Sequence, residues 1–388
     1  MDAEFELLDL PSNLPQAKQV HDQGFDSKKD SFFIGWSWIS SWVNIFCQVM
    51  QKKGVGDCQL KLLVIKENDK VLASLFCGIH TRSILWIFKS KKAFIGATGI
   101  QEVDSICIEK NNILFTKKDD LFQLDINDVL FFLGVECLSV PGIKDSSWNM
   151  FSKMLGVDKK RSIIRAVPTY YVNLSAIQSV NGDYLSILSA NKRSQINRSL
   201  KFYGGRESVY IEKPSSLDEA LEMFDDLFIL HSEQWKKKEI PSSFANTTAK
   251  QFHHYLILSA WEAGEIGLYK IRNNKCVIGY LYGFISHGTF LFYQSAFMYE
   301  EDNKIKSGLL CHLLLIEYLI DRGFRSYDFL AGDSQYKKSL STDSYMMNWI
   351  DIYKYDWHCF LVKKIRYCKR RVSSLLDSIF TLLSLKRN

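Results

Sequence analysis

The short segment 331–337 brings together side chains that can move protons. It reads Ala-Gly-Asp-Ser-Gln-Tyr-Lys, so that a carboxylate (Asp333), a phenol (Tyr336) and an amine (Lys337) stand close together along the chain. A carboxylate serves as a general base when burial or a neighbouring charge moves its pKa toward neutrality. The alternative is that Gly332-Asp333 forms an ordinary turn, because both residue types are common in turns.

The residues before this segment predict the elements that would position it. They read as an aromatic strand at 289–297, a polar loop at 302–307, an apolar helix at 308–320 and a short strand at 325–330. A chain that passes from a strand through a loop into a helix leaves backbone N–H groups free at the positive end of the helix dipole. Phosphate groups commonly bind there. The sequence therefore predicts an anion site at the start of this helix, with an ordinary helix start as the alternative.

Composition predicts a globular chain of two domains. The 388 residues are 47% hydrophobic and 14% aromatic, which is enough for large cores. The net charge is +6, but residues 363–388 carry eight bases and one acid, so that the rest of the chain sums to −1. A near-neutral body is not a nucleic-acid platform, and we expect no nucleic-acid partner.

The cysteines and the N-terminal residues predict a cytoplasmic protein. The nine cysteines are odd in number and form no CxxC pair, which favours buried thiols over a disulfide framework or a metal site. We expect no metal. The acidic N-terminal residues lack the pattern of a signal peptide. The uncharged run 31–51 separates polar and aromatic residues onto opposite helical faces, which predicts a packed amphipathic helix and not a membrane span.

The pattern of elements predicts an N-terminal α/β unit at 1–165, a second unit at 166–358 and a basic tail at 359–388. The first unit is predicted to contain helices at 31–51, 119–130 and 142–161 and strands at 62–66, 71–79, 84–89 and 131–140. The second is predicted to contain helices at 182–203, 217–237, 251–263 and 308–320 and strands at 170–174, 268–272, 276–286, 289–297, 325–330 and 348–355. Ser216 and Glu219 have the spacing of a capping box that would open the helix at 217.

Several local motifs of the second unit occur together. They are Arg193 in a basic helix, His231-Ser232-Glu233-Gln234-Trp235 followed by Phe244, Ser307-Gly308-Leu309-Leu310 before the apolar helix, and Asp328-Phe329-Leu330-Ala331-Gly332-Asp333-Ser334-Gln335-Tyr336-Lys337. With these motifs and this order of elements, residues 170–356 resemble a GNAT acyltransferase core. Within that superfamily they resemble the CelD/BcsL-type acetyltransferases, which are related to the Fem peptidyltransferases. The resemblance implies an α/β (α+β) fold of two GNAT-like mixed-sheet units in tandem, the second a full acyl-CoA N-acyltransferase core.

The resemblance also implies roles for individual residues. It implies an acetyl-CoA or other acyl-CoA co-substrate, whose pyrophosphate would lie on the backbone N–H groups of Ser307, Gly308, Leu309 and Leu310 beside Lys306. Asp333 and His231 are the candidate bases, the backbone from Ser295 to Phe297 would hold the oxyanion, and Tyr336 would protonate the thiolate. Arg193, Trp235, Asp328 and Lys337 are the candidate contacts for an amine acceptor. The chain departs from the family where Lys306-Ser307-Gly308 replaces the usual Ser-Pro-Gly.

Other readings of the same residues stay open. His231 lies on an apolar helical stripe and would equally suit a core histidine. An amino sugar or other surface-polysaccharide precursor is the acceptor that the resemblance suggests. A Fem-like transfer from aminoacyl-tRNA and a non-catalytic scaffold in glycan synthesis are the alternatives. The amphipathic tail 359–388 predicts either contact with an anionic membrane surface or a docking helix.

Overall fold

The computed structural model describes the chain except for residues 1–2, 54–57, 85–87, 107, 117–122, 181, 240–241, 243, 356, 358–359, 362–363 and 365–388. The predicted tail therefore lies almost entirely outside the described residues. Within the described part of the chain, no helix is long and apolar enough to cross a membrane. The uncharged run near residue 40 instead forms helix α2 (Trp36–Lys53).

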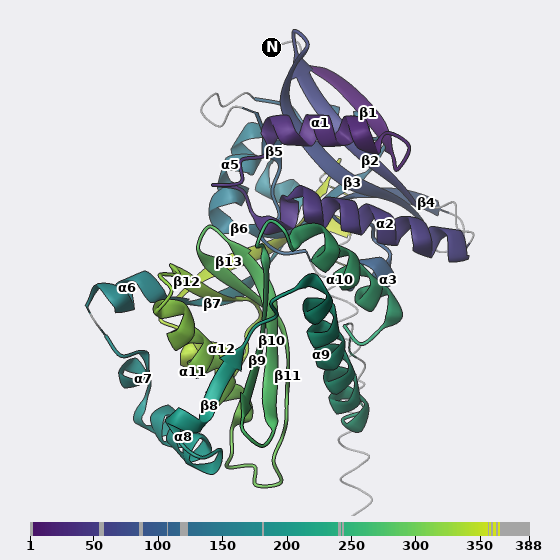
Figure 1. Ribbon diagram of the computed structural model, residues 1–388. Coiled ribbons are helices and arrows are strands. Elements are labelled where there is room, and N and C mark those ends of the chain that lie inside the picture. The colour runs from purple at the N-terminus through teal and green to yellow at the C-terminus, as the bar shows by residue number, and fades with distance from the viewer. Residues whose placement is uncertain are drawn as a thin grey trace, which may run out of the picture.

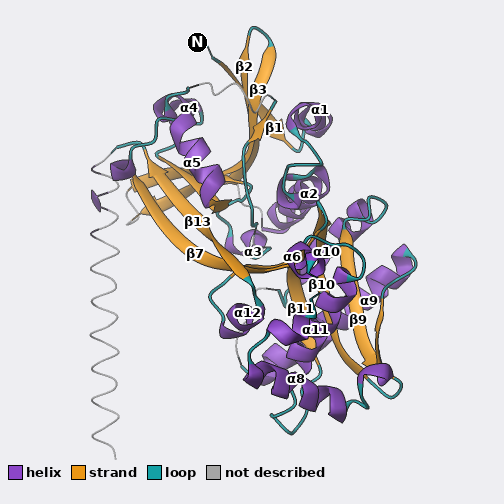
Figure 2. Ribbon diagram, turned by 90° about the vertical axis from the view of Figure 1, so that its left-hand side faces the viewer, coloured by secondary structure: helices purple, strands orange, loops and turns teal. Residues whose placement is uncertain are grey.

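One large mixed sheet runs through the molecule (Figures 1 and 2). Its strands pair in the order β1-β2-β3-β4-β6-β13-β7-β12-β11-β10-β9-β8, and β5 pairs with β3. The strand bounds are β1 Glu4–Leu10, β2 Cys58–Glu67, β3 Lys70–Ile84, β4 Phe88–Ile95, β5 Leu114–Phe115, β6 Cys137–Lys144, β7 Ser162–Asn173, β8 Val209–Glu212, β9 Ile266–Asn273, β10 Val277–Ser286, β11 Thr289–Phe297, β12 Ser326–Ala331 and β13 Asp343–Tyr353.

The helices lie on both faces of this sheet (Figure 1). Those before β7 are α1 Leu14–Gly24, α2, α3 Gln101–Asp104, α4 Ile126–Phe132 and α5 Asp145–Met154, with short 3₁₀ turns at Phe32–Ile34 and Lys159–Arg161. Those after β7 are α6 Leu174–Ser179, α7 Tyr184–Ile187, α8 Ala190–Phe202, α9 Leu217–Lys237, α10 Thr247–Ala260, α11 Ser307–Ile320 and α12 Gln335–Leu340, with a 3₁₀ turn at Arg206–Ser208.

The two halves of the sheet repeat one arrangement and exchange a strand. In each half a helix pair precedes three antiparallel strands, and the third of these pairs in parallel with a later strand, β4 with β6 and β11 with β12. The strand that ends each half then crosses over: β13 pairs with β6, and β7 pairs with β12. The predicted fold of two GNAT-like mixed-sheet units in tandem is confirmed, and β7 runs through the boundary predicted near residue 165.

Three buried clusters hold the units together. One continuous core joins α1 and α2 to α9 and α10, and α2 contacts α10 directly. A second surrounds α11, whose side chains are buried on nearly all sides, as its continuous apolar sequence requires. The third packs α4 and α5 on the sheet of the first unit. The shared first core means that the two units bury apolar surface against each other as well as within themselves.

Several predicted bounds are wrong for local reasons. The helix predicted at 182–203 is two helices, because Ser189 is extended and its side chain caps α8 through the Lys192 N–H. The helix predicted at 142–161 is shorter, since α5 spans only Asp145–Met154. The strand predicted at 131–140 begins at Cys137, because α4 and a turn at Gly134 with φ +63° occupy the residues before it. The capping box is half correct.

At that box, Ser216 accepts a hydrogen bond from the Glu219 N–H, as predicted. The Glu219 carboxylate, however, does not return to Ser216. It accepts from both the backbone N–H and the hydroxyl of Ser215. The start of α9 is still doubly capped, with the second bond moved one residue outward.

Candidate active site

Strands β11 and β12 separate at the centre of the second unit. Their parallel pairing runs only from Thr289–Ser326 to Leu291–Asp328. Just beyond it, Tyr293 is an extra residue in β11, since Tyr282 pairs with Gln294 and Gly283 with Phe292. Such a bulge bends a strand and redirects its side chains. The gap that opens leaves the edge of β11 beside the start of α11.

The start of α11 carries unpaired backbone donors. Lys306 is its N-cap residue and makes no side-chain cap, and the Leu310 N–H is the first that bonds within the helix, to the Lys306 carbonyl. The N–H groups before it have no intrahelical partner, and the helix dipole makes this end positive. Gly308 lets the helix lie against Phe297, because a Cβ there would stand 3.0 Å from the Phe297 ring.

A cavity of about 510 Å³, called here the α11 cavity, joins these two features. Of the predicted site residues, its lining includes His231, Trp235, Ser295, Phe297, Lys306, Ser307, Gly308, Leu309 and Tyr336. Of the predicted pyrophosphate contacts, Leu310 alone is not in the lining. The exposed Lys306 and Lys238 give the lining two cations, whereas Glu300 is its one carboxylate. The cavity thus combines helix N–H groups, cations and a strand edge, which suits a phosphorylated chain that ends in a carbonyl group.

His231 is held on both sides of its ring. Nδ1 lies 3.1 Å from the Ser295 carbonyl and therefore donates to it, so that Nε2, 3.0 Å from the Ser242 hydroxyl, accepts. Burial lowers the pKa of His231, which keeps the ring neutral near pH 7. These contacts tie α9 to the bulged strand β11, and they orient the histidine at the cavity wall.

Tyr336 closes the cavity from α12. Its ring stacks on His312, with centroids 5.6 Å apart, and burial raises the pKa of its hydroxyl well above the usual value. His312 is fully buried; burial lowers its pKa to about 3, and its Nδ1 lies 2.8 Å from the Tyr327 hydroxyl. Tyr336 is therefore a protonated phenol at neutral pH, able to give a proton to an anion formed in the cavity.

Asp333 lies elsewhere. Its side chain is exposed, accepts a hydrogen bond from the Tyr170 hydroxyl at 3.1 Å and is not part of the α11 cavity lining. Its role as a base stays a prediction. Arg193 is also outside the α11 cavity lining. Its guanidinium donates to the carbonyls of Ser186 and Leu188 and so braces the chain before α8.

Asp328 and Lys337 flank a distorted stretch of β12. Leu330 has φ +58°, a strained conformation for a branched residue, and Asp328 stabilises it by accepting from the Leu330 N–H at 2.9 Å. Asp328 also pairs with Lys110 at 2.6 Å and is almost fully buried. Lys337 donates to the Ala331 carbonyl at 2.8 Å.

The backbone of Ala331 also meets a residue from the first unit. The Ala331 N–H donates to the Glu109 carboxylate at 2.7 Å. Burial raises the pKa of Glu109 to about 7, although this hydrogen bond and Lys337 oppose the rise. The two residues thus bind the backbone of Ala331 at its two ends, Glu109 at the N–H and Lys337 at the carbonyl.

Sequence reasoning missed several residues of the site. His312 looks like one more core residue in an apolar helix, and Lys238 is one of several lysines at the end of α9. Gln234, which donates to the Phe297 carbonyl, stood inside a recognised motif but had no role assigned. No sequence motif pointed to Glu109, because its loop meets β12 only in the folded protein.

Comparison with known proteins identifies one domain. Residues 190–338 match the acetyltransferase (GNAT) domain family. No curated protein matches the chain. FemX resembles it with a TM-score of 0.49 and 10% identity, over 88% of this chain and 96% of FemX.

Two further structures give similar values. A conserved protein of unknown function from Bacteroides thetaiotaomicron has a TM-score of 0.47 and 12% identity, over 90% of this chain and 100% of that one. A tandem GNAT protein from the clavulanic acid biosynthesis pathway has a TM-score of 0.39 and 9% identity, over 90% and 98%. On the family match and the strand order described above, this chain contains an acetyltransferase domain of the GNAT superfamily.

Proposed function

We propose that this chain transfers an acyl group from an acyl-CoA to an amine. One observation carries the proposal: the α11 cavity links the unpaired N–H groups at the start of α11 to the edge of β11, where the strands separate. The first feature suits the pyrophosphate of CoA and the second suits a thioester carbonyl. Lys306 belongs to the Lys-Ser-Gly that stands in place of the family's usual Ser-Pro-Gly. Together with Lys238 it adds positive charge to that of the helix dipole.

The reaction is then a direct attack on the thioester. The amine nitrogen attacks the carbonyl carbon, the C–S bond breaks, and Tyr336 is positioned to protonate the thiolate. Ser295 offers a backbone donor to the carbonyl oxygen, although its N–H now donates to the side-chain oxygen of Gln294 at 3.0 Å. The Gln294 side chain must therefore turn away when the thioester binds.

Within the superfamily we propose the CelD/BcsL type, with an amino sugar or other polysaccharide precursor as acceptor. The motifs at 231–235 and 328–337 support this choice. A cytoplasmic location, with the tail at 359–388 touching a membrane, belongs to the same proposal.

The test is turnover by the purified chain. Acetyl-CoA and longer acyl-CoAs are incubated with a panel of amines, and free CoA and acylated product are separated by chromatography and identified by mass spectrometry. We expect stoichiometric CoA and amide with at least one amine. Transfer from an aminoacyl-tRNA in a parallel reaction, with none from any acyl-CoA, would replace the proposal with the Fem-like alternative. Absence of transfer from both donors would favour the scaffold.

A further inference from the structure

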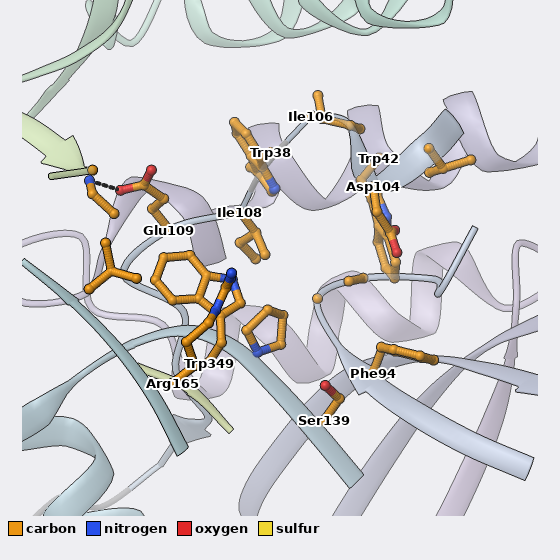
Figure 3. A pocket seen from close by; sticks show the side chains of 17 residues that line it. Trp38, Trp42, Phe94, Asp104, Ile106, Ile108, Glu109, Ser139, Arg165 and Trp349 are labelled. Atoms are coloured by element: carbon orange, nitrogen blue, oxygen red, sulfur yellow. Dashed lines mark hydrogen bonds between the residues drawn. The ribbon is translucent and has the colours of Figure 1, made fainter. Parts of the chain in front are cut away.

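A second cavity, called here the seam cavity, lies where the two units meet (Figure 3). Its volume is about 510 Å³, and most of its lining is apolar. Trp38 and Trp42 reach it from α2 and Trp349 from β13, the exchanged strand. Flat indole faces suit a planar ring or the apolar face of a sugar ring.

Few polar groups of this lining can serve a ligand. The Asp104 carboxylate accepts from the backbone N–H groups of Thr98 and Gly99, at 2.7 and 2.6 Å, and Ser139 donates to Asp351. Both are committed to the fold. The remaining charged groups are Glu109 and Arg165, and the Arg165 guanidinium lies over the Trp349 ring, 5.0 Å from its centroid. The seam cavity therefore offers a ligand one carboxylate, Glu109, and one cation, Arg165, on an aromatic lining.

Glu109 stands at the gap between β11 and β12. Its loop crosses that gap, because the Tyr293 hydroxyl of β11 donates to the Ile106 carbonyl and the Ala331 N–H of β12 donates to Glu109. The residues of β11 that follow Tyr293, Gln294 and Ser295, line the α11 cavity. Both cavities thus border the same gap, the seam cavity at Ala331 of β12 and the α11 cavity at Gln294 and Ser295 of β11.

We propose that the seam cavity binds the acceptor, a primary amine on a ring that also carries an anionic group. The ring lies among the tryptophans, the anion pairs with Arg165, and the ammonium group meets Glu109 at the gap. This inference rests on the proposed acyl transfer and assigns its acceptor site and its base. The N-terminal unit then supplies a catalytic residue to the GNAT domain of the second unit.

Protons and bonds balance along this path. The Glu109 carboxylate takes one proton from the ammonium group, and the neutral nitrogen attacks the thioester carbon. A C–N bond forms, the C–S bond breaks, Tyr336 gives its proton to the thiolate, and the second nitrogen proton restores the phenol of Tyr336. The third stays on the amide. Glu109 afterwards returns its proton to solvent.

The surroundings of Glu109 suit this task. Burial is the main cause that raises its pKa to about 7, while Asp328 raises it further and the Ala331 N–H, Lys337 and Lys110 lower it. A base with a pKa near the working pH is half deprotonated and still strong enough to accept a proton. The dependence of rate on pH should therefore have an ascending limb near neutrality.

Binding is tested on the full chain without acyl-CoA, so that it does not depend on turnover. Glucosamine 6-phosphate and tryptophan each carry a ring, an amine and an anion, and they distinguish a sugar ring from an aromatic one. Glucosamine lacks the anion. We expect one of the two anionic probes to bind by calorimetry. Arg165→Glu should weaken its binding by about tenfold or more, because a charge-assisted pair is replaced by repulsion.

Lys153→Glu is the matched control, since Lys153 is exposed on α5 and is absent from both cavities. It should bind the probe like the wild type. Glu109→Gln should keep acyl-CoA binding and lose the ascending pH limb of transfer. Binding of neither anionic probe, or equal binding to Arg165→Glu, overturns this inference. If acyl-CoA binding and transfer persist in that case, the proposed function stands; if both fail, the proposed function has failed as well.

Discussion

At the scale of single residues, the proposed chemistry divides between a phenol and a carboxylate from different units. Tyr336 is kept protonated by its burial against His312, and the raised pKa of Glu109 brings that carboxylate close to titration at neutral pH. The motif at 328–337 was enough to single out Tyr336, which lines the α11 cavity. It could not predict Glu109, because no short spacing links residue 109 to residue 331.

Tyr336→Phe should lower kcat by about 100-fold, the contribution expected of a positioned general acid, with little change in KM for acyl-CoA. Steady-state kinetics measure both. Tyr318→Phe is the control, because Tyr318 lies in the last turn of α11 and outside the cavity lining. An unchanged kcat in Tyr336→Phe would remove the tyrosine from the mechanism.

The raised pKa of Glu109 also predicts a change in stability with pH. The folded pKa of about 7 lies above the ordinary value of 4.5. The folded state therefore binds more protons in this window, and the contribution of Glu109 to stability is lost as pH rises toward and through 7. Thermal unfolding should show the wild type losing stability relative to Glu109→Gln between pH 5 and pH 8. Parallel curves for the two proteins would show that Glu109 titrates normally.

At the scale of elements, the bulge in β11 is what opens the site. Gly283 stands opposite it on β10, and a Cβ there would lie 2.1 Å from the Leu291 carbonyl oxygen. The sequence predicted β10, β11 and the turn between them, since alternation and turn residues are local signals. It did not predict the bulge, which depends on pairing with β10. The break between α7 and α8 has a local signal, the Ser189 cap of α8, that the sequence prediction did not use.

Gly283→Ala should therefore destabilise the protein by about 1–3 kcal/mol or more, because the backbone cannot yield to the added methyl group. Gly308→Ala should cost less, since its Cβ would meet the edge of a phenyl ring at 3.0 Å and that ring can shift. Chemical denaturation of both variants gives the comparison. A larger loss for Gly308→Ala would mean that the bulge tolerates change and the start of α11 does not.

At the scale of the whole molecule, the exchange of β7 and β13 interlocks the two units. Ile350 of β13 is buried in the core of the first unit, although β13 follows the second unit in sequence. The composition and the motifs predicted two units. They could not predict the exchange. The same order of strands along the chain would also allow β7 to pair within the first unit and β13 within the second.

We expect the chain to unfold in one transition and fragments 1–165 and 166–388 to be insoluble alone. Each fragment would expose a long unpaired strand edge, which promotes aggregation. Co-expression should restore a soluble complex. A soluble, folded monomer of 1–165 would show that the exchange is dispensable.

The central claim is that acyl-CoA binds with its pyrophosphate at the start of α11. Isothermal titration of the purified chain with acetyl-CoA and CoA tests it most directly, repeated on Lys306→Glu and on Lys304→Glu. Both lysines lie on the same exposed loop, but only Lys306 is in the cavity lining. We expect micromolar binding to the wild type, about tenfold weaker binding to Lys306→Glu and near-normal binding to Lys304→Glu. No binding of any acyl-CoA, or equal binding to all three proteins, would contradict the claim.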